Sequence, residues 1–286
     1  MLNRHESQTC FIRHLNLRSA ARLCVALCAL WAAPAGAMHI YTLSDDNSSA
    51  QINPLSQFGM VNWTVDGRDQ MDQQAYWFRV GNSGPEKAIS QLGQAYVTQP
   101  SDSTLQATYL NRLLSVQILY TLTGGDDGSG YSSMAQQITI QNRTSQPLDF
   151  HLFQYTDLAC GGGATEFAQG SDGSITGVQV TRSKHSVTQI LNTTFNPGAD
   201  HASTAANLLA QLNDCFATTL ANGCGPFTNG AWGLEWDYLL DAKGQLVLTQ
   251  LLAADPVPVP EPSSLALIGA AGLAWAIARR NNRRVL

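Results

Sequence analysis

The sequence predicts an all-β fold, an antiparallel β-sandwich with one short helix, in a chain that carries an apolar helix near each end. The clearest evidence is Leu114–Leu122, where apolar residues alternate with mostly polar ones, as in a strand with one buried face. The glycine-rich stretch Gly124–Gly130 follows, and Met134–Asn142 resumes the alternation, which together indicate a hairpin. Helical periodicity is almost absent between residues 38 and 255, a length that suits one large β domain.

Other short segments with strand-like composition recur along this domain, each bounded by turn residues. Leu148–Thr156 is apolar on both faces, so we expect it to be a central strand. Tyr76 and Phe78 share one strand face while Trp77 points the other way, so either both faces are covered there or one ring is exposed. Such spacing of short strands is typical of a β-sandwich. The remaining predicted strands are His39–Leu43, Met60–Val65, Tyr76–Val80, Ala95–Gln99, Leu105–Leu110, Ile175–Thr181, Val187–Leu191, Trp232–Tyr238 and Gln245–Leu251.

The one short helix is predicted at Thr204–Leu212. Ser203 or Thr204 would cap it, because a hydroxyl oxygen can accept a hydrogen bond from the free N–H groups of the first turn.

Residues 1–37 have the pattern of a secretory signal peptide. Arginines precede the apolar stretch Leu23–Ala33, and Ala35 and Ala37 provide a small-x-small cleavage site. Cleavage after Ala37 would leave Met38 as the first residue of the mature chain. We therefore expect export, with the Sec machinery as a partner.

Residues 256–286 form a tail in three parts. A proline-rich spacer ends in Pro260-Glu261-Pro262, the apolar run Leu265–Ala278 follows, and four arginines come near the end. The run has about 14 residues, fewer than the roughly 20 of a stable transmembrane helix, so we expect only a transient inner-membrane stage. The arginines favour the cytoplasmic side, which leaves the domain outside. The prolines hold the spacer extended, the form that a protease cleft accepts.

This tail resembles the PEP-CTERM sorting signal of exported bacterial proteins. In that family a membrane peptidase, exosortase, cuts at or near the motif. The resemblance implies that Pro260, Glu261 and Pro262 are the recognition residues and that exosortase is a partner during export. It also implies a Gram-negative host that makes exopolysaccharide. The alternative is a C-terminal anchor that is never cut.

The charge of the mature region excludes some classes of partner. Between Met38 and Pro260 there are eight Lys and Arg against nineteen Asp and Glu, a net charge of about −11 that the whole-chain value of −5 conceals. An acidic domain repels polyanions, so nucleic acid and anionic lipid surfaces are not expected partners. Neutral polysaccharide, calcium-bridged surfaces and protein partners remain.

The mature region retains three cysteines, Cys160, Cys215 and Cys224. An oxidising compartment favours a disulfide, and Cys215 with Cys224, which flank a turn-rich stretch, form the predicted pair. The pairings of Cys160 with Cys215 or with Cys224 stay open. No CxxC motif or His/Cys cluster indicates zinc or redox chemistry.

Two sets of ionisable residues are catalytic candidates by residue type. Glu235 and Asp237 share one face of their predicted strand about 7 Å apart, and such a pair can act on a glycosidic bond, but we expect a solvated outer face. His151 and Asp157 bracket an aromatic strand, and we expect a partnered core or edge histidine. No catalytic residue is therefore predicted.

Aspartates in two loops are candidates for calcium ligands: Asp66, Asp69 and Asp72 in one, Asp126 and Asp127 in the other. Neither loop has the EF-hand spacing, so no metal and no other cofactor is predicted. A GxSxG elbow and the Walker A and GxGxxG loops are all missing from the sequence, which argues against common hydrolase and nucleotide sites.

A second resemblance lies in the mature region. Trp63–Gly67, Trp77–Gly81 and Phe150–Asp157 are similar to segments in the exported domain of other PEP-CTERM proteins, with which no established activity travels. The hairpin pattern also resembles the galactose-mutarotase-like supersandwich of carbohydrate-active proteins, a likeness of fold rather than of function. Aromatic groups around Trp77 and Trp236 are able to stack on sugar rings, although their alternation favours core filling.

The sequence favours an exported, non-enzymatic protein of the cell surface or extracellular matrix, processed at its tail and associated with exopolysaccharide. The first alternative is a carbohydrate-active or carbohydrate-binding protein on a supersandwich, and the second is a calcium-dependent adhesion module. A wide cleft with converging carboxylates would favour an enzyme. A closed sandwich would favour the matrix protein, and Asp oxygens clustered around a loop would favour adhesion.

Overall fold

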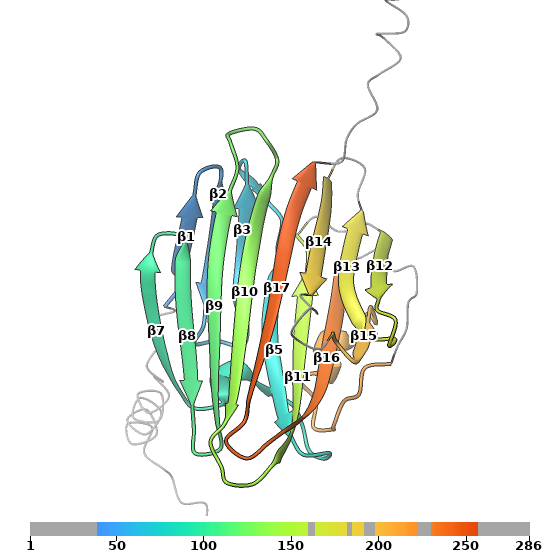
Figure 1. Ribbon diagram of the computed structural model, residues 1–286. Helices are drawn as coiled ribbons and strands as arrows, with labels where there is room; N and C mark the ends of the chain where they lie inside the picture. The colour runs from blue at the N-terminus through green and yellow to red at the C-terminus, as the bar shows by residue number, and fades with distance from the viewer. Residues whose placement is uncertain (1–38, 160–163, 182–184, 192–197, 222–229, 257–286) are drawn as a thin grey trace, which may run out of the picture. The chain divides into compact units, whose positions relative to one another are not determined.

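The computed structural model describes residues 39–159, 164–181, 185–191, 198–221 and 230–256, which are coloured in Figure 1. The predicted signal peptide and the predicted tail after Pro256 lie outside these ranges. None of the helices within the ranges is long and apolar enough to cross a membrane.

One sheet, called sheet A below, is made of β1 (Tyr41–Asp45), β2 (Ser48–Asn53), β3 (Gly59–Val65), β4 (Arg68–Asp69), β5 (Gln73–Val80), β6 (Lys87–Ala88), β11 (Leu148–Asp157), β15 (His201–Ser203) and β16 (Ala231–Leu240). Its order is β1-β2-β3-β5-β11-β16-β15, with β4 beside β3 and β6 beside β5. The pairs are antiparallel except for a short parallel contact between β3 and β5. β11 pairs with β5 on one side and β16 on the other, which confirms that Leu148–Thr156 is a central strand.

The other sheet, sheet B, is made of β7 (Gln94–Ser101), β8 (Thr104–Leu110), β9 (Leu114–Gly124), β10 (Ser132–Asn142), β12 (Ala164–Gln169), β13 (Ile175–Thr181), β14 (His185–Leu191) and β17 (Gln245–Pro256). Its order is β12-β13-β14-β17-β10-β9-β8-β7. β9 and β10 form the predicted hairpin, with Ile118 opposite Ile138. β17 lies inside the sheet, between β14 and β10, as Figure 1 shows.

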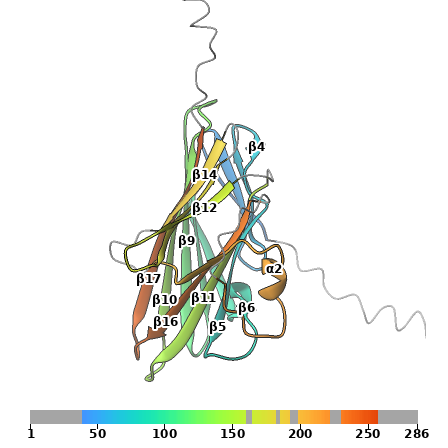
Figure 2. The same ribbon diagram turned by 90° about the vertical axis from the view of Figure 1, so that its right-hand side faces the viewer.

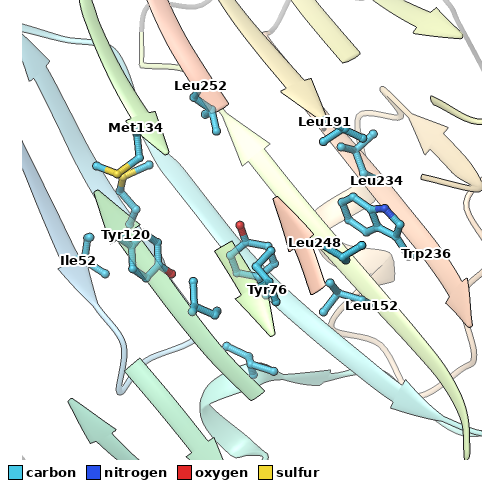
Figure 3. Close-up of a cluster of buried hydrophobic side chains, with 14 of the residues drawn as sticks. Ile52, Tyr76, Tyr120, Met134, Leu152, Leu191, Leu234, Trp236, Leu248 and Leu252 are labelled. Carbon is cyan, nitrogen blue, oxygen red and sulfur yellow. The ribbon is translucent and has the colours of Figure 1, made fainter. Parts of the chain in front are cut away.

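The two sheets enclose one hydrophobic core (Figure 2). Alternate residues of each strand point inward, so the core draws on both sheets; Figure 3 shows Tyr76, Leu152 and Trp236 from sheet A with Tyr120, Met134 and Leu248 from sheet B. Ile118 is 0% exposed, as its place in the alternating strand predicts. Tyr76 and Phe78 belong to this core while Trp77 is buried on the other face, so both faces of β5 are covered.

A network of buried polar side chains crosses this core. Tyr76 donates to Gln136 at 2.6 Å, Trp232 donates through Nε1 to Gln189 at 2.8 Å, and Gln189 donates to Gln154 at 3.0 Å. Burial raises the pKa of Tyr76 well above its ordinary value, so its hydroxyl stays a donor. Each amide finds a partner across the sheets, which fixes how the sheets align. The members are Gln74, Tyr76, Gln136, Gln154, Thr156, Gln189, Trp232 and Gln250.

The predicted sandwich is confirmed, and each predicted strand overlaps an observed one. The strands that the sequence did not indicate are β2, β4, β6, β12 and β15. They are short, or rich in small and polar residues, so neighbouring strands rather than their own periodicity determine them.

The short helical elements are η1 (Ile89–Gln91) and α2 (Leu208–Gln211). α2 is shorter than the predicted Thr204–Leu212, and the predicted cap is wrong. Asn207 occupies the N-cap position without a side-chain cap, while Ser203 accepts from the N–H of Ala205 at 3.2 Å in a local turn.

Candidate functional site

Part of the outer face of sheet A is covered by residues 204–221, called the covering segment below, which includes α2. In Figure 2, α2 lies on the far side of sheet A from sheet B. Leu208, Leu212 and Leu220 pack there against Trp77 and Phe153, and with Ala75, Ala88, Tyr155 and Ala231 they make a second, smaller core. The part of the outer face formed by β5 and β11 is therefore shielded from water by apolar side chains of the covering segment.

A buried ion pair fastens the covering segment at Thr218. Arg79 on β5 contacts Glu86, and their side chains are 5% and 0% exposed. Arg79 Nη1 also donates to the carbonyl of Thr218 at 2.7 Å, and the N–H of Thr218 donates to Glu86 Oε1 at 2.8 Å. The guanidinium lies 5.4 Å from the ring centre of Phe153, in cation–π range. Both main-chain polar groups of Thr218 are thus held by one charged pair.

Glu235 on β16 fastens the end of the segment. It is 0% exposed, and its Oε2 accepts from the N–H of Leu220 at 2.6 Å. Burial raises the pKa of Glu235 to about 8; the N–H of Leu220 is the main opposing effect, and the charge of Asp237 adds to the rise. The expectation of a solvated Glu235 is wrong, because the covering segment removes water from this face.

His151, Glu235 and Asp237 come together at the margin of the covered area. His151 on β11 and Asp237 on β16 are directly opposite in the ladder, and His151 Nδ1 hydrogen-bonds Asp237 Oδ1. Glu235 lies on the same face, two residues before Asp237 and opposite His201 of β15. His201 Nε2 is 3.6 Å from Asp237 Oδ2. His151 is therefore a partnered histidine, as expected.

One ligand atom from each of His151, Glu235 and Asp237 lies within 4.8 Å of the other two. Imidazole nitrogen and carboxylate oxygen at such spacing can share a proton or bind one divalent cation. The sequence did not indicate this cluster, because it arises from the register of β11 against β16. His201, Arg79 and Glu86 were not singled out either, and no local motif marks them.

The hollow of about 500 Å³ that β12, β13 and β14 line belongs to sheet B. Glu235 and Asp237 lie on sheet A, so this hollow and the carboxyl pair do not form one cleft.

The remaining residues singled out in the sequence lie away from this cluster or outside the described residues. Asp66 accepts from the N–H groups of Gly128 and Gly130 at 2.7 Å each, so it joins its own loop to the glycine-rich loop. Cys215 is exposed, whereas Cys160 and Cys224 lie outside the described residues, so the disulfide stays a prediction. Ala35, Ala37, Pro260, Glu261 and Pro262 also lie outside them.

The end of the chain matches a known family model, the PEP-CTERM protein-sorting motif, over residues 258–284. The chain carries a PEP-CTERM sorting signal. The resemblance drawn from the proline motif, the apolar run and the arginines is confirmed, and the signal marks an exported protein. The match begins two residues after β17 ends at Pro256.

No curated protein sequence matches the chain. Among solved structures, the chain is similar to a galactose mutarotase-like protein from Lactobacillus casei, at 12% identity and a TM-score of 0.43, over 75% of this chain and 99% of that one. It is also similar to a galactose mutarotase related enzyme from Lactobacillus acidophilus, at 6% identity and a TM-score of 0.46, over 78% of this chain and 98% of that one. A third similar structure is a bacterial glucoamylase complexed with acarbose, at 8% identity and a TM-score of 0.47. The similarity covers 78% of this chain but 34% of the enzyme. These likenesses concern the fold alone.

Proposed function

We propose that this is an exported, non-enzymatic protein of the cell surface or extracellular matrix, cut by exosortase at Pro260–Pro262. The observation that carries the proposal is the PEP-CTERM match at residues 258–284, next to the last residue of the folded domain. β17 is paired up to Pro256, opposite His185. Cleavage of the chain four or more residues after Pro256 therefore leaves every described strand intact.

The closed interior supports a structural role. The space between the sheets is filled by side chains such as Trp63, Trp232 and Phe150, each 0% exposed. The glutamine side chains inside the core bond one another and Tyr76, Thr156 and Trp232, so they do not converge on a substrate. In an exopolysaccharide matrix, the acidic outer surface of such a domain favours contacts with neutral or cation-bridged glycans.

A carbohydrate-active protein is the second candidate, and the convergence of Glu235, Asp237 and His151 favours it. The covering segment lies over Glu235, however, and a sugar ring would have to displace it. Glycan-array binding by the full chain, with and without Asp237→Asn, separates the two: a saccharide whose binding depends on Asp237 would support this second candidate.

The processing step is tested by deleting Pro260–Pro262. We expect an uncut precursor that stays in the membrane fraction, because the recognition residues are gone while the apolar run remains. The readout is the intact mass of the protein recovered from the membrane and from the surface. The Ser263→Ala/Ser264→Ala chain is the matched control, which should be cut as the parent is. Surface material that still ends in the arginines would contradict the proposal.

A further inference from the structure

We propose that His151, Glu235 and Asp237 form a binding site for one divalent transition-metal ion such as Zn²⁺, which pins the covering segment to sheet A. The site is separate from the sorting signal and does not depend on how the tail is processed.

The backbone prearranges the three ligands. His151 and Asp237 are ladder partners on adjacent antiparallel strands, so their Cβ atoms lie about 4.5–5.5 Å apart. Glu235 is on the same strand face as Asp237, and one ligand atom of each of the three lies within 4.8 Å of the others. A cation needs little more than side-chain rotation to contact all three.

Buried polar atoms without partners point to a missing ligand. Glu235 is 0% exposed, yet its Oε1 has no donor among the described residues and faces only the carboxyl group of Asp237. His151 is 6% exposed, and its Nε2 has only a long contact of 3.5 Å with Asp149 Oδ1. Leaving such atoms unpaired costs about 1–3 kcal/mol each, so a group that satisfies them is expected.

The local charge also calls for a cation. Besides Glu235 and Asp237, Asp149 lies 3.5 Å from His151 Nε2, and Asp200 accepts from the N–H of Asp237 at 2.8 Å. The guanidinium of Arg79 is already engaged by Glu86. Four carboxyl groups therefore lie around His151 and His201, and a bound divalent ion would offset the charge of those that are ionised.

The mixture of one imidazole and two carboxylates selects the class of ion. Zinc accepts nitrogen and carboxylate oxygen together, whereas calcium and magnesium prefer oxygen alone. Because Leu220 donates to the other oxygen of Glu235, a bound ion would fix the carboxylate to which the covering segment is attached.

The test is equilibrium dialysis of the full chain, purified in detergent, against Zn²⁺ after alkylation of accessible thiols, with bound metal measured by mass spectrometry. We expect the parent to bind one Zn²⁺ more than Glu235→Gln or Asp237→Asn. In these variants the affinity for that ion should fall by more than about 100-fold, which exceeds the effect of losing a residue that only hydrogen-bonds to a metal ligand. Hydrogen exchange at residues 208–220 should slow on zinc addition in the parent and not in the variants.

The control is His39→Gln, which removes an exposed histidine outside the cluster and should bind zinc as the parent does. The Asp237 side chain is partly exposed, so Asp237→Asn should keep the fold, and far-ultraviolet circular dichroism checks both variants. Equal zinc binding by all chains would overturn the proposal. So would no binding by the parent, which would leave a proton shared by the two carboxylates as the better account.

Discussion

The two faces of sheet A are buried by different means. The inner face packs on sheet B through apolar side chains that alternate along long strands. The outer face is buried by the covering segment, whose main chain bonds to the charged side chains of Arg79, Glu86 and Glu235. Strand packing needs only the correct periodicity, whereas an irregular segment needs individual partners for its own N–H and C=O groups. The outer core is therefore the more sensitive to single charge changes.

The largest expected effect comes from breaking the buried ion pair. Glu86→Leu leaves the Arg79 charge buried without its paired carboxylate and removes the acceptor for the N–H of Thr218. We expect the free energy of unfolding to fall by about 3–5 kcal/mol, measured by chemical denaturation.

The double variant Arg79→Met/Glu86→Leu is the control for this change, and it should lose less than Glu86→Leu alone because no buried charge remains. A loss below about 1 kcal/mol for Glu86→Leu would show that apolar packing alone holds the covering segment, and the contrast between the faces would disappear.

The inner core is tested at Ile118. Ile118→Ala removes buried methyl groups at the centre of β9 and leaves a cavity, so the free energy of unfolding should fall by about 2–5 kcal/mol. Gln117, on the opposite face of the strand, should accept alanine with a change within about 0.5 kcal/mol. Denaturant titration of both variants makes the comparison. Equal effects would mean that the burial of β9 does not alternate, and a reversed order would mean that its register is shifted by one residue.

The smallest effect is expected at Asp66, where a carboxylate holds main-chain N–H groups as Glu235 does, but at the rim of the sandwich. The N–H groups of Gly128 and Gly130 lower the pKa of Asp66 below its ordinary value of 3.8. Between the folded and unfolded pKa values the unfolded chain binds more protons, so the stability from Asp66 is present above pH 3.8 and is lost as the pH falls through the lower folded value.

Asp66→Asn should therefore be slightly less stable than the parent at pH 7, and the difference should shrink below about pH 3.8. Asparagine suits the positive φ of 48° at this position, so the comparison adds no backbone strain. Melting curves at pH 7 and pH 3 measure it. A difference that persists undiminished in acid would assign the effect to shape rather than to charge.

The sequence predicts the inner core well and the outer core poorly, for a physical reason. Alternation at Leu114–Leu122 and around Trp77 reports burial on sheet faces, and both patterns agree with the structure. The glutamine network is hidden, because an isolated Gln136 or Gln189 is indistinguishable from a surface residue until the sheets are aligned. Glu235 was expected in water because the sequence gives no sign that residues 204–221 fold back over it. The cluster with His151 depends on ladder register, which a single strand does not encode.

The position of β17 has a mechanical consequence. Any tension transmitted through the chain beyond Pro256 enters the domain along an internal strand that is paired with β10 on one side and β14 on the other. The load is then directed along the strand, in shear, so that hydrogen bonds of both ladders resist together rather than opening one after another as in peeling of an edge strand. Resistance to forced unfolding is governed by the unfolding rate, so we expect an attachment loaded in shear to unfold more slowly than one at an edge strand. While the tail is still attached, the domain would be held through a strand that is paired on both sides.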